Sequence, residues 1–153
     1  MYLGYQNEKI KFYTEQPLDQ EFYNLDKIEE TELEYVLDGE EYVLNDERYK
    51  EKKAQEERER ISNLFLTGAD VERGIYQAKG MDFDDILTYV TRLQPEGLDI
   101  KALKIELKAN NFYRGNPYVN AIGALLGFTS EQLDKFFETN DYTVLLDIPR
   151  ENV

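Results

Sequence analysis

The chain has 153 residues and a formal net charge of −14, with 41% hydrophobic and 13% aromatic residues. This content of apolar side chains predicts a folded protein, and the length suffices for one good core or two small ones. The sequence contains no cysteine and no histidine, which excludes disulfides and thiolate metal sites. Without cysteine and histidine, the chain also lacks the side chains that form most nucleophile–base pairs in enzymes.

The negative charge is unevenly distributed along the chain. Residues 1–45 carry 12 acidic and 3 basic side chains, residues 46–65 carry 6 of each, and residues 66–153 carry 14 and 9. No segment has the basic surplus that nucleic-acid phosphates or acidic lipids require, so we expect neither as a partner. The N-terminal residues show no signal peptide and no apolar run approaches a membrane span, so we expect a protein that is not secreted by a signal peptide.

The first 45 residues are predicted to be rich in β-structure. The stretch "LEYVLDGEEYVLN" places Asp38-Gly39 between two alternating apolar runs, which is typical of a type I′ hairpin. A two-residue loop there pairs Tyr35 with Tyr42 and Leu33 with Leu44. The earlier "KIKFYTEQ" is expected to add a strand that packs Ile10 and Phe12 against this hairpin or against a partner chain.

A charged helix is predicted over residues 46–66. Nine of the eleven residues from Lys50 to Arg60 are charged, and good helix formers dominate. Such a helix either bridges two lobes or associates with copies of itself along a narrow seam. The bridging alternative is favoured, because Ala54 and Ile61 alone do not make a heptad pattern.

After Leu66 the sequence predicts a helical domain, residues 67–153, with about five short helices. Each expected helix begins at a capping residue, and glycines end several of them. We expect the tail "YTVLLDIP" to be a strand. The fold class is therefore α+β. The predicted helix starts are Thr67 with Asp70, Asp82 with Asp85, Asp99, Asn116 before Pro117, and Thr129 with Gln132.

Two segments of this helical domain align without gaps at an offset of 47 residues. Gly80 matches Gly127, and Ile86 matches Leu133. Each unit, residues 68–90 and 115–137, is predicted to be a helical hairpin whose glycine supplies a left-handed C-cap. The match has two explanations that fit about equally well: a true duplication, or capping and turn residues that arose independently in two helical hairpins.

The second hairpin, with "GALLGFTSEQLDKFFETND", also has the layout of a DNA-reading helix-turn-helix. Its candidate reading helix, residues 129–141, has a net charge of −3, which phosphates would repel, so we expect no DNA reading. The acidity allows an alternative function, an inhibitor that mimics DNA and binds a nucleic-acid enzyme or DNA-binding protein.

We predict no enzymatic activity, no cofactor and no metal. The cluster Asp82, Asp84 and Asp85 has two interpretations, a divalent-cation site or helix capping. Capping is favoured because EF-hand spacing is absent and acidic residues are expected in a first helical turn.

Aromatic side chains are the candidate protein contacts, since tyrosine combines a large packing area with a polar tip. Phe112, Tyr113 and Arg114 form an aromatic and cationic patch at a turn, which suits protein contact. The alternative, which is favoured, is that Phe112 and Tyr113 close the core, with Arg114 paired to an acidic neighbour. The candidate contact residues are Tyr35, Tyr42, Phe112, Tyr113 and Arg114.

The segments "ADVERGIYQAKGMDFDDI" and "NNFYRGNPYVNAIGALLGFTSEQLDKFFETNDY" resemble small proteins encoded in tail or baseplate gene clusters of Gram-positive bacteriophages and prophages. The N-terminal β segment and the charged helix at 46–60 also resemble these proteins. The resemblance implies a viral structural or assembly role, as a virion component or as an accessory that helps a tail or receptor-binding protein fold. It implies phage tail or receptor-binding proteins as partners, and the host cytoplasm during assembly, or the virion, as the location. A homo-oligomer is expected because tail parts are ring-symmetric.

Overall fold

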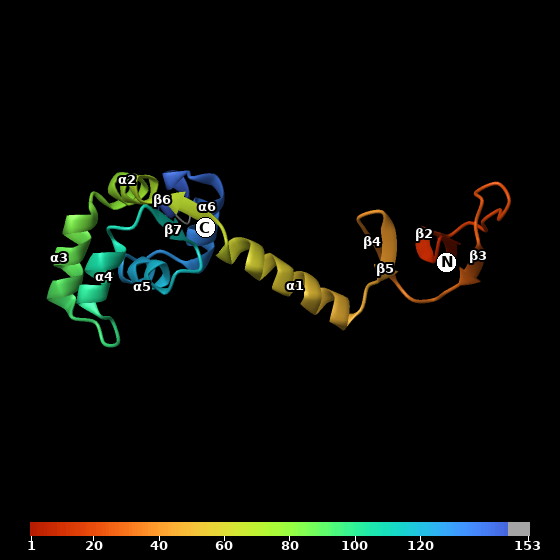
Figure 1. Ribbon diagram of the computed structural model, residues 1–153, viewed down its shortest axis with the longest axis horizontal. Coiled ribbons are helices and arrows are strands. Elements are labelled where there is room, and N and C mark those ends of the chain that lie inside the picture. Colours follow the sequence, from red (N-terminus) through yellow and green to blue (C-terminus); the bar gives the residue numbers. More distant parts are fainter. Residues whose placement is uncertain (147–153) are drawn as a thin grey trace, which may run out of the picture. The chain divides into compact units, whose positions relative to one another are not determined.

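The computed structural model describes residues 1–146, and the protein is of the α+β class, as the sequence predicts. The chain divides into two compact units, residues 1–56 and 57–153. Figure 1 shows their elements in chain order. The elements are β1 Tyr2–Gln6, β2 Lys9–Thr14, β3 Lys27–Glu30, β4 Tyr35–Asp38, β5 Glu41–Leu44, α1 Glu47–Ser62, β6 Phe65–Thr67, α2 Gly68–Lys79, α3 Phe83–Leu93, α4 Ile100–Glu106, β7 Asn111–Tyr113, α5 Pro117–Leu125, α6 Ser130–Thr139 and the 3₁₀ helix η1 Tyr142–Leu145.

The first unit contains a three-stranded antiparallel sheet in the order β2-β1-β3 and the separate β4–β5 hairpin. Its apolar core is small. Among the sixteen apolar side chains that are buried in the described residues, only Leu3 and Leu25 belong to this unit. A β-unit of this size therefore derives little stability from burial and depends on surface ring contacts and hydrogen bonds.

The register of the β4–β5 hairpin differs from the predicted one. Asp38 pairs with Glu41, Leu37 with Tyr42 and Tyr35 with Leu44, so the two turn residues are Gly39 and Glu40. Of these two only Gly39 has a positive φ, 69°. A type II′ turn requires glycine at its first central position. The turn therefore begins one residue later than the predicted one. The partner of each residue shifts by two positions along the other strand, so the same side chains still share a face.

The strand predicted from "KIKFYTEQ" is confirmed as β2, but its packing was predicted wrongly in one respect. The ring of Phe12 lies against Tyr23, with centroids 5.0 Å apart. The neighbouring Tyr13 makes the ring contacts to the hairpin instead, at 5.6 Å from Tyr35 and 5.9 Å from Tyr42. Adjacent residues of a strand point to opposite faces, so only one of the two rings can meet the hairpin.

The charged helix is confirmed as α1, although it ends at Ser62 instead of residue 66. Every residue of α1 is exposed or only half-buried, and the helix crosses the boundary between the two units. Beyond Ser62 the backbone leads into β6, and just before that strand the Leu64 carbonyl accepts the Arg114 N–H at 2.8 Å. This long-range bond explains why the helix is shorter than its composition suggests.

The second unit contains the main core, and its helices begin where the sequence predicts. Asp82 with Asp85 and Thr129 with Gln132 form complete capping boxes. At α2 the Thr67 hydroxyl accepts the Asp70 N–H and caps the helix, while the Asp70 carboxylate accepts from Arg73 at 2.9 Å, and no capping box is formed. The side chains of Asp99 and Asn116 cap α4 and α5.

Both predicted hairpins are present, and each is preceded by a short strand that the sequence analysis missed. β6 pairs antiparallel with β7, with Leu66 opposite Phe112. The second unit thus repeats a strand–helix–helix arrangement, β6-α2-α3 and β7-α5-α6, with α4 between the copies. Gly80 and Gly127, at φ 74° and 84°, occupy the left-handed positions that end α2 and follow α5.

The predicted C-terminal strand is wrong for residues 142–145, which form the 3₁₀ helix η1. The Asp141 carboxylate accepts from the N–H and hydroxyl of Thr143, at 2.9 and 2.7 Å, and starts this turn. Leu145, 1% exposed, then enters the core. The remainder of the predicted strand lies mostly outside the described residues.

Candidate protein-contact surfaces

Tyr35 and Tyr42, predicted as contact residues, lie on one face of the β4–β5 hairpin. Both are half-buried, and both rings contact Tyr13 of β2. The Tyr13 hydroxyl donates to the Leu33 carbonyl at 3.1 Å. In this arrangement the two tyrosines hold the hairpin against β2 within the first unit.

Another tyrosine of this unit, Tyr5, has an unusual electrostatic environment. Its hydroxyl donates to the Glu29 carboxylate at 2.9 Å, and the Lys27 ammonium lies 4.6 Å from its ring centroid. Burial and the Glu29 carboxylate disfavour the phenolate and raise the pKa of Tyr5 from 10.0 to about 12.

This shift predicts a loss of stability at high pH. An unfolded chain ionises Tyr5 near its ordinary pKa, whereas the folded chain keeps the proton, so the stabilisation is complete below pH 10 and declines as the pH rises towards 12. A tyrosine absorbance titration is expected to contain one late step that Tyr5→Phe removes. An unchanged late step in that variant would show that another tyrosine is responsible.

Phe112 and Arg114, also predicted as contact residues, are buried in the second unit and offer no surface. Phe112 is 4% exposed and Arg114 5% exposed. The prediction of a surface patch is therefore wrong for these two residues, and the core-closing alternative is right. The physical reason is the β6–β7 pairing, which turns the side chain of Phe112 inwards opposite Leu66.

The buried Arg114 side chain is the centre of a polar network whose partners are half-buried or exposed. Its Nε donates to Asp134 at 2.7 Å and its Nη1 to the Asn120 side chain at 2.6 Å. Its Nη2 donates to the Ser130 hydroxyl at 3.0 Å. These bonds connect the end of β7 with α5 and α6, so the guanidinium organises the second hairpin.

Tyr113 is the one member of the predicted patch that reaches the surface. It is 51% exposed and lies opposite Phe65, which is 53% exposed, with ring centroids 5.6 Å apart. We call Phe65 and Tyr113 the ribbon pair. Phe65 is not among the predicted contact residues, because the predicted charged helix includes it, and only the pairing of β6 with β7 brings the two rings together.

A second exposed aromatic group, which the sequence analysis also missed, lies in the first unit. Phe22, 78% exposed, stands on the turn between β2 and β3. Its ring packs edge-on against Tyr23 at a centroid distance of 4.8 Å. A local signal existed in "QEFYNL", where two adjacent aromatic residues lie between polar residues typical of a turn.

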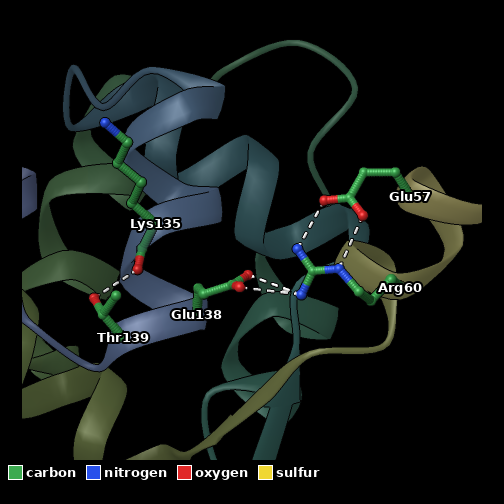
Figure 2. Close-up of polar contacts among 5 residues, drawn as sticks. All are labelled: Glu57, Arg60, Lys135, Glu138 and Thr139. Atoms are coloured by element: carbon green, nitrogen blue, oxygen red, sulfur yellow. Dashed lines mark hydrogen bonds and ion pairs between the residues drawn. The ribbon is translucent and has the colours of Figure 1, made fainter. Parts of the chain in front are cut away.

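The α5–α6 hairpin has the helix-turn-helix layout that raised the question of DNA reading. Glu138, an acidic residue of its second helix, forms an ion pair within the chain, as Figure 2 shows. Arg60 of α1 donates through Nη1 to both oxygens of Glu138, at 3.1 and 3.0 Å. Through Nε and Nη2 it donates to Glu57, at 2.9 and 2.7 Å.

These bonds raise the pKa of Arg60 above its ordinary value and lower that of Glu57. All three side chains are about half exposed, so the pairs contribute little stability individually. Their effect is positional, because they hold the last turn of α1 beside α6. The absence of DNA reading stays a prediction.

Of the three aspartates considered for a metal ion, Asp82 and Asp85 form a helix cap, and Asp84 lies in the first turn of α3. The Asp82 carboxylate accepts the Asp85 N–H at 2.8 Å, and the Asp85 carboxylate accepts the Asp82 N–H at 3.0 Å. Within residues 1–146 no three acidic side chains are grouped so that they could hold a metal ion. In the same part of the chain no helix combines the length and apolarity needed to cross a bilayer.

Comparison with protein-family models, with curated proteins and with solved structures finds no match to this chain.

Proposed function

We propose that this chain is a non-enzymatic structural or assembly protein of a phage tail module, which acts through protein–protein contacts. The observation that carries the proposal is the ribbon pair. Phe65 and Tyr113 are half exposed on a two-stranded ribbon whose opposite face is buried through Leu66 and Phe112. The tail context comes from the resemblance of the sequence to tail and baseplate proteins.

The ribbon pair suits a binding surface because its geometry is fixed before a partner arrives. The ribbon is held by the Gly68 N–H, which donates to Asn110 O at 2.7 Å, and by the bond from Arg114 N–H to Leu64 O. Rings that are already ordered lose little conformational entropy when a partner covers them. Aromatic side chains are also enriched among the residues that dominate interface energies.

The test replaces both rings by serine, F65S with Y113S, in a phage-producing strain whose own copy of the gene is deleted. We expect the deletion to reduce tailed particles, and the double variant to restore them about thirtyfold less well than the wild-type chain, as truncation of an interface hot spot implies. Electron microscopy of the particles and infectious titre measure the effect.

The matched control is Tyr76→Ser, which removes a 59% exposed ring from α2 of the same unit. This variant is expected to restore particles as the wild type does. Circular dichroism checks that each variant is folded. Normal particles from the deletion strain, with no copy of this chain associated with them, would refute the proposed function.

A further inference from the structure

The turn that contains Phe22 is well ordered by its own hydrogen bonds. The Asp19 carboxylate accepts the N–H groups of Glu21 and Phe22 at 3.0 and 2.9 Å. The Leu25 N–H donates to the Gln20 carbonyl at 2.9 Å and closes the turn. The backbone at Phe22 therefore has a defined conformation.

The same turn is fixed to the sheet of the first unit. The Gln6 side chain donates to the Tyr23 carbonyl at 2.7 Å, and the Asn7 N–H donates to the Asp26 carboxylate at 2.6 Å. Leu25 is 6% exposed and lies so close to Gly4 that a Cβ at Gly4 would be 3.1 Å from it. The turn is thus anchored at its base, while its tip carries an apolar ring.

Phe22 is the most exposed of the large apolar side chains in residues 1–146. Its ring rests on Tyr23, and Tyr23 in turn rests on Phe12 of β2. This row of rings supports Phe22 from one side and leaves its other side in water. An ordered, projecting phenyl ring has the geometry of an interface anchor that fills a pocket on a partner.

The charge around Phe22 indicates the chemistry of that partner. Residues 15–26 contain four carboxylates and no lysine or arginine, namely Glu15, Asp19, Glu21 and Asp26. Asp19 and Glu21 lie within three residues of Phe22, so this acidic segment is complementary to basic side chains and is repelled by acidic lipid headgroups.

A second copy of this chain fits the anchor poorly. A symmetric contact between two copies would bring the same four carboxylates against each other. The apolar cavity in the core of the second unit has a volume of only about 40 Å³, whereas a cavity that takes a benzene ring measures roughly 150 Å³.

We infer that Phe22 is a docking anchor that inserts into an apolar pocket rimmed by lysine or arginine on a different protein. This inference rests on the proposed function for the identity of the partner as a tail-module protein. The chemistry of recognition does not depend on that identity, so the two can be tested separately.

The first test uses β-cyclodextrin, whose apolar cavity accepts a phenyl or indole group, and its derivative with an ammonium group on each primary carbon. The chain contains no tryptophan, so the emission of F22W reports position 22 alone. We expect the ammonium derivative to bind F22W about tenfold more tightly than neutral β-cyclodextrin at low salt, and this preference to shrink as salt screens the charges.

The matched control is F65W, because Phe65 is also exposed but residues 61–69 contain no charged side chain. F65W is expected to show a much smaller preference for the ammonium derivative than F22W. Equal binding of both cyclodextrins by F22W, or emission that is already shielded before any is added, would overturn the inference.

The second test places the photoreactive residue p-benzoylphenylalanine at position 22 in particle-producing cells, and at position 65 for comparison. We expect crosslinks from position 22 to an apolar segment of another tail-module protein, with lysine or arginine beside the crosslinked site. Crosslinks to a second copy of this chain or to lipid, or none from position 22, would overturn the inference. Crosslinks from position 22 to a protein outside the tail module, again at an apolar segment beside lysine or arginine, would support the docking anchor and contradict the proposed tail role.

Discussion

Replacement of Arg114 by methionine is expected to lower the free energy of unfolding of the second unit by about 1.5–3 kcal/mol, the range for hydrogen bonds that involve a charged group. Methionine fills similar space but donates no hydrogen bond. It leaves the oxygens of Asp134 and Asn120 without the guanidinium that each contacts at under 3 Å. Urea unfolding followed by the helical circular dichroism signal measures the loss.

Arg60→Met is the matched control, because Arg60 also pairs with carboxylates but does so at the surface, where its side chain is 47% exposed. Water replaces the lost bonds there, so we expect a much smaller change in the midpoint of unfolding. Equal losses in the two variants would show that the Arg114 network is no more stabilising than a surface ion pair.

The helices of the second unit could be predicted because their signals are local. A capping side chain bonds to a backbone N–H only two or three residues away, as at Asp82 and Thr129. A glycine such as Gly80 ends a helix through its own positive φ. These features depend on neighbours in the sequence and hold in almost any tertiary context.

The β6–β7 ribbon could not be predicted, because each strand is only three residues long and its partner is more than 40 residues away. Nothing in "FLT" or "NFY" distinguishes such a strand from the end of a helix. Strand pairing depends on tertiary contacts that a local pattern does not contain. The error in the length of the charged helix has the same cause.

The candidate contact residues show the same limit. An aromatic residue beside a turn can face the core or the solvent, and residues 112–114 alternate between the two because β7 alternates its side chains. Sequence composition identifies aromatic groups, but only the pairing of β7 decides that Tyr113 is exposed and Phe112 is not. The exposure of Phe22 likewise depends on how residues 19–26 fold onto the first sheet.

Phe136→Ala is expected to lower the free energy of unfolding by about 3–5 kcal/mol, because it removes a large side chain from a well-packed core. Phe136 is 2% exposed, and its ring lies over Gly74 of α2. A Cβ added at Gly74 would lie 2.6 Å from the Cε1 atom of that ring and closer still to its Cζ. The two positions are therefore coupled, and urea unfolding of the single and double variants measures the coupling.

Gly74→Ala is expected to change sign between the two backgrounds. In the wild type the added methyl group collides with the ring, and we expect a net loss of about 1–2 kcal/mol. In the Phe136→Ala background the collision is absent, so the better helix propensity of alanine should yield a gain of about 1 kcal/mol. Gly123→Ala is the control, because its Cβ would meet Leu133 at 2.6 Å and not Phe136. It should destabilise both backgrounds, and a Gly74→Ala effect of the same sign in both would contradict the close packing of α2 against Phe136.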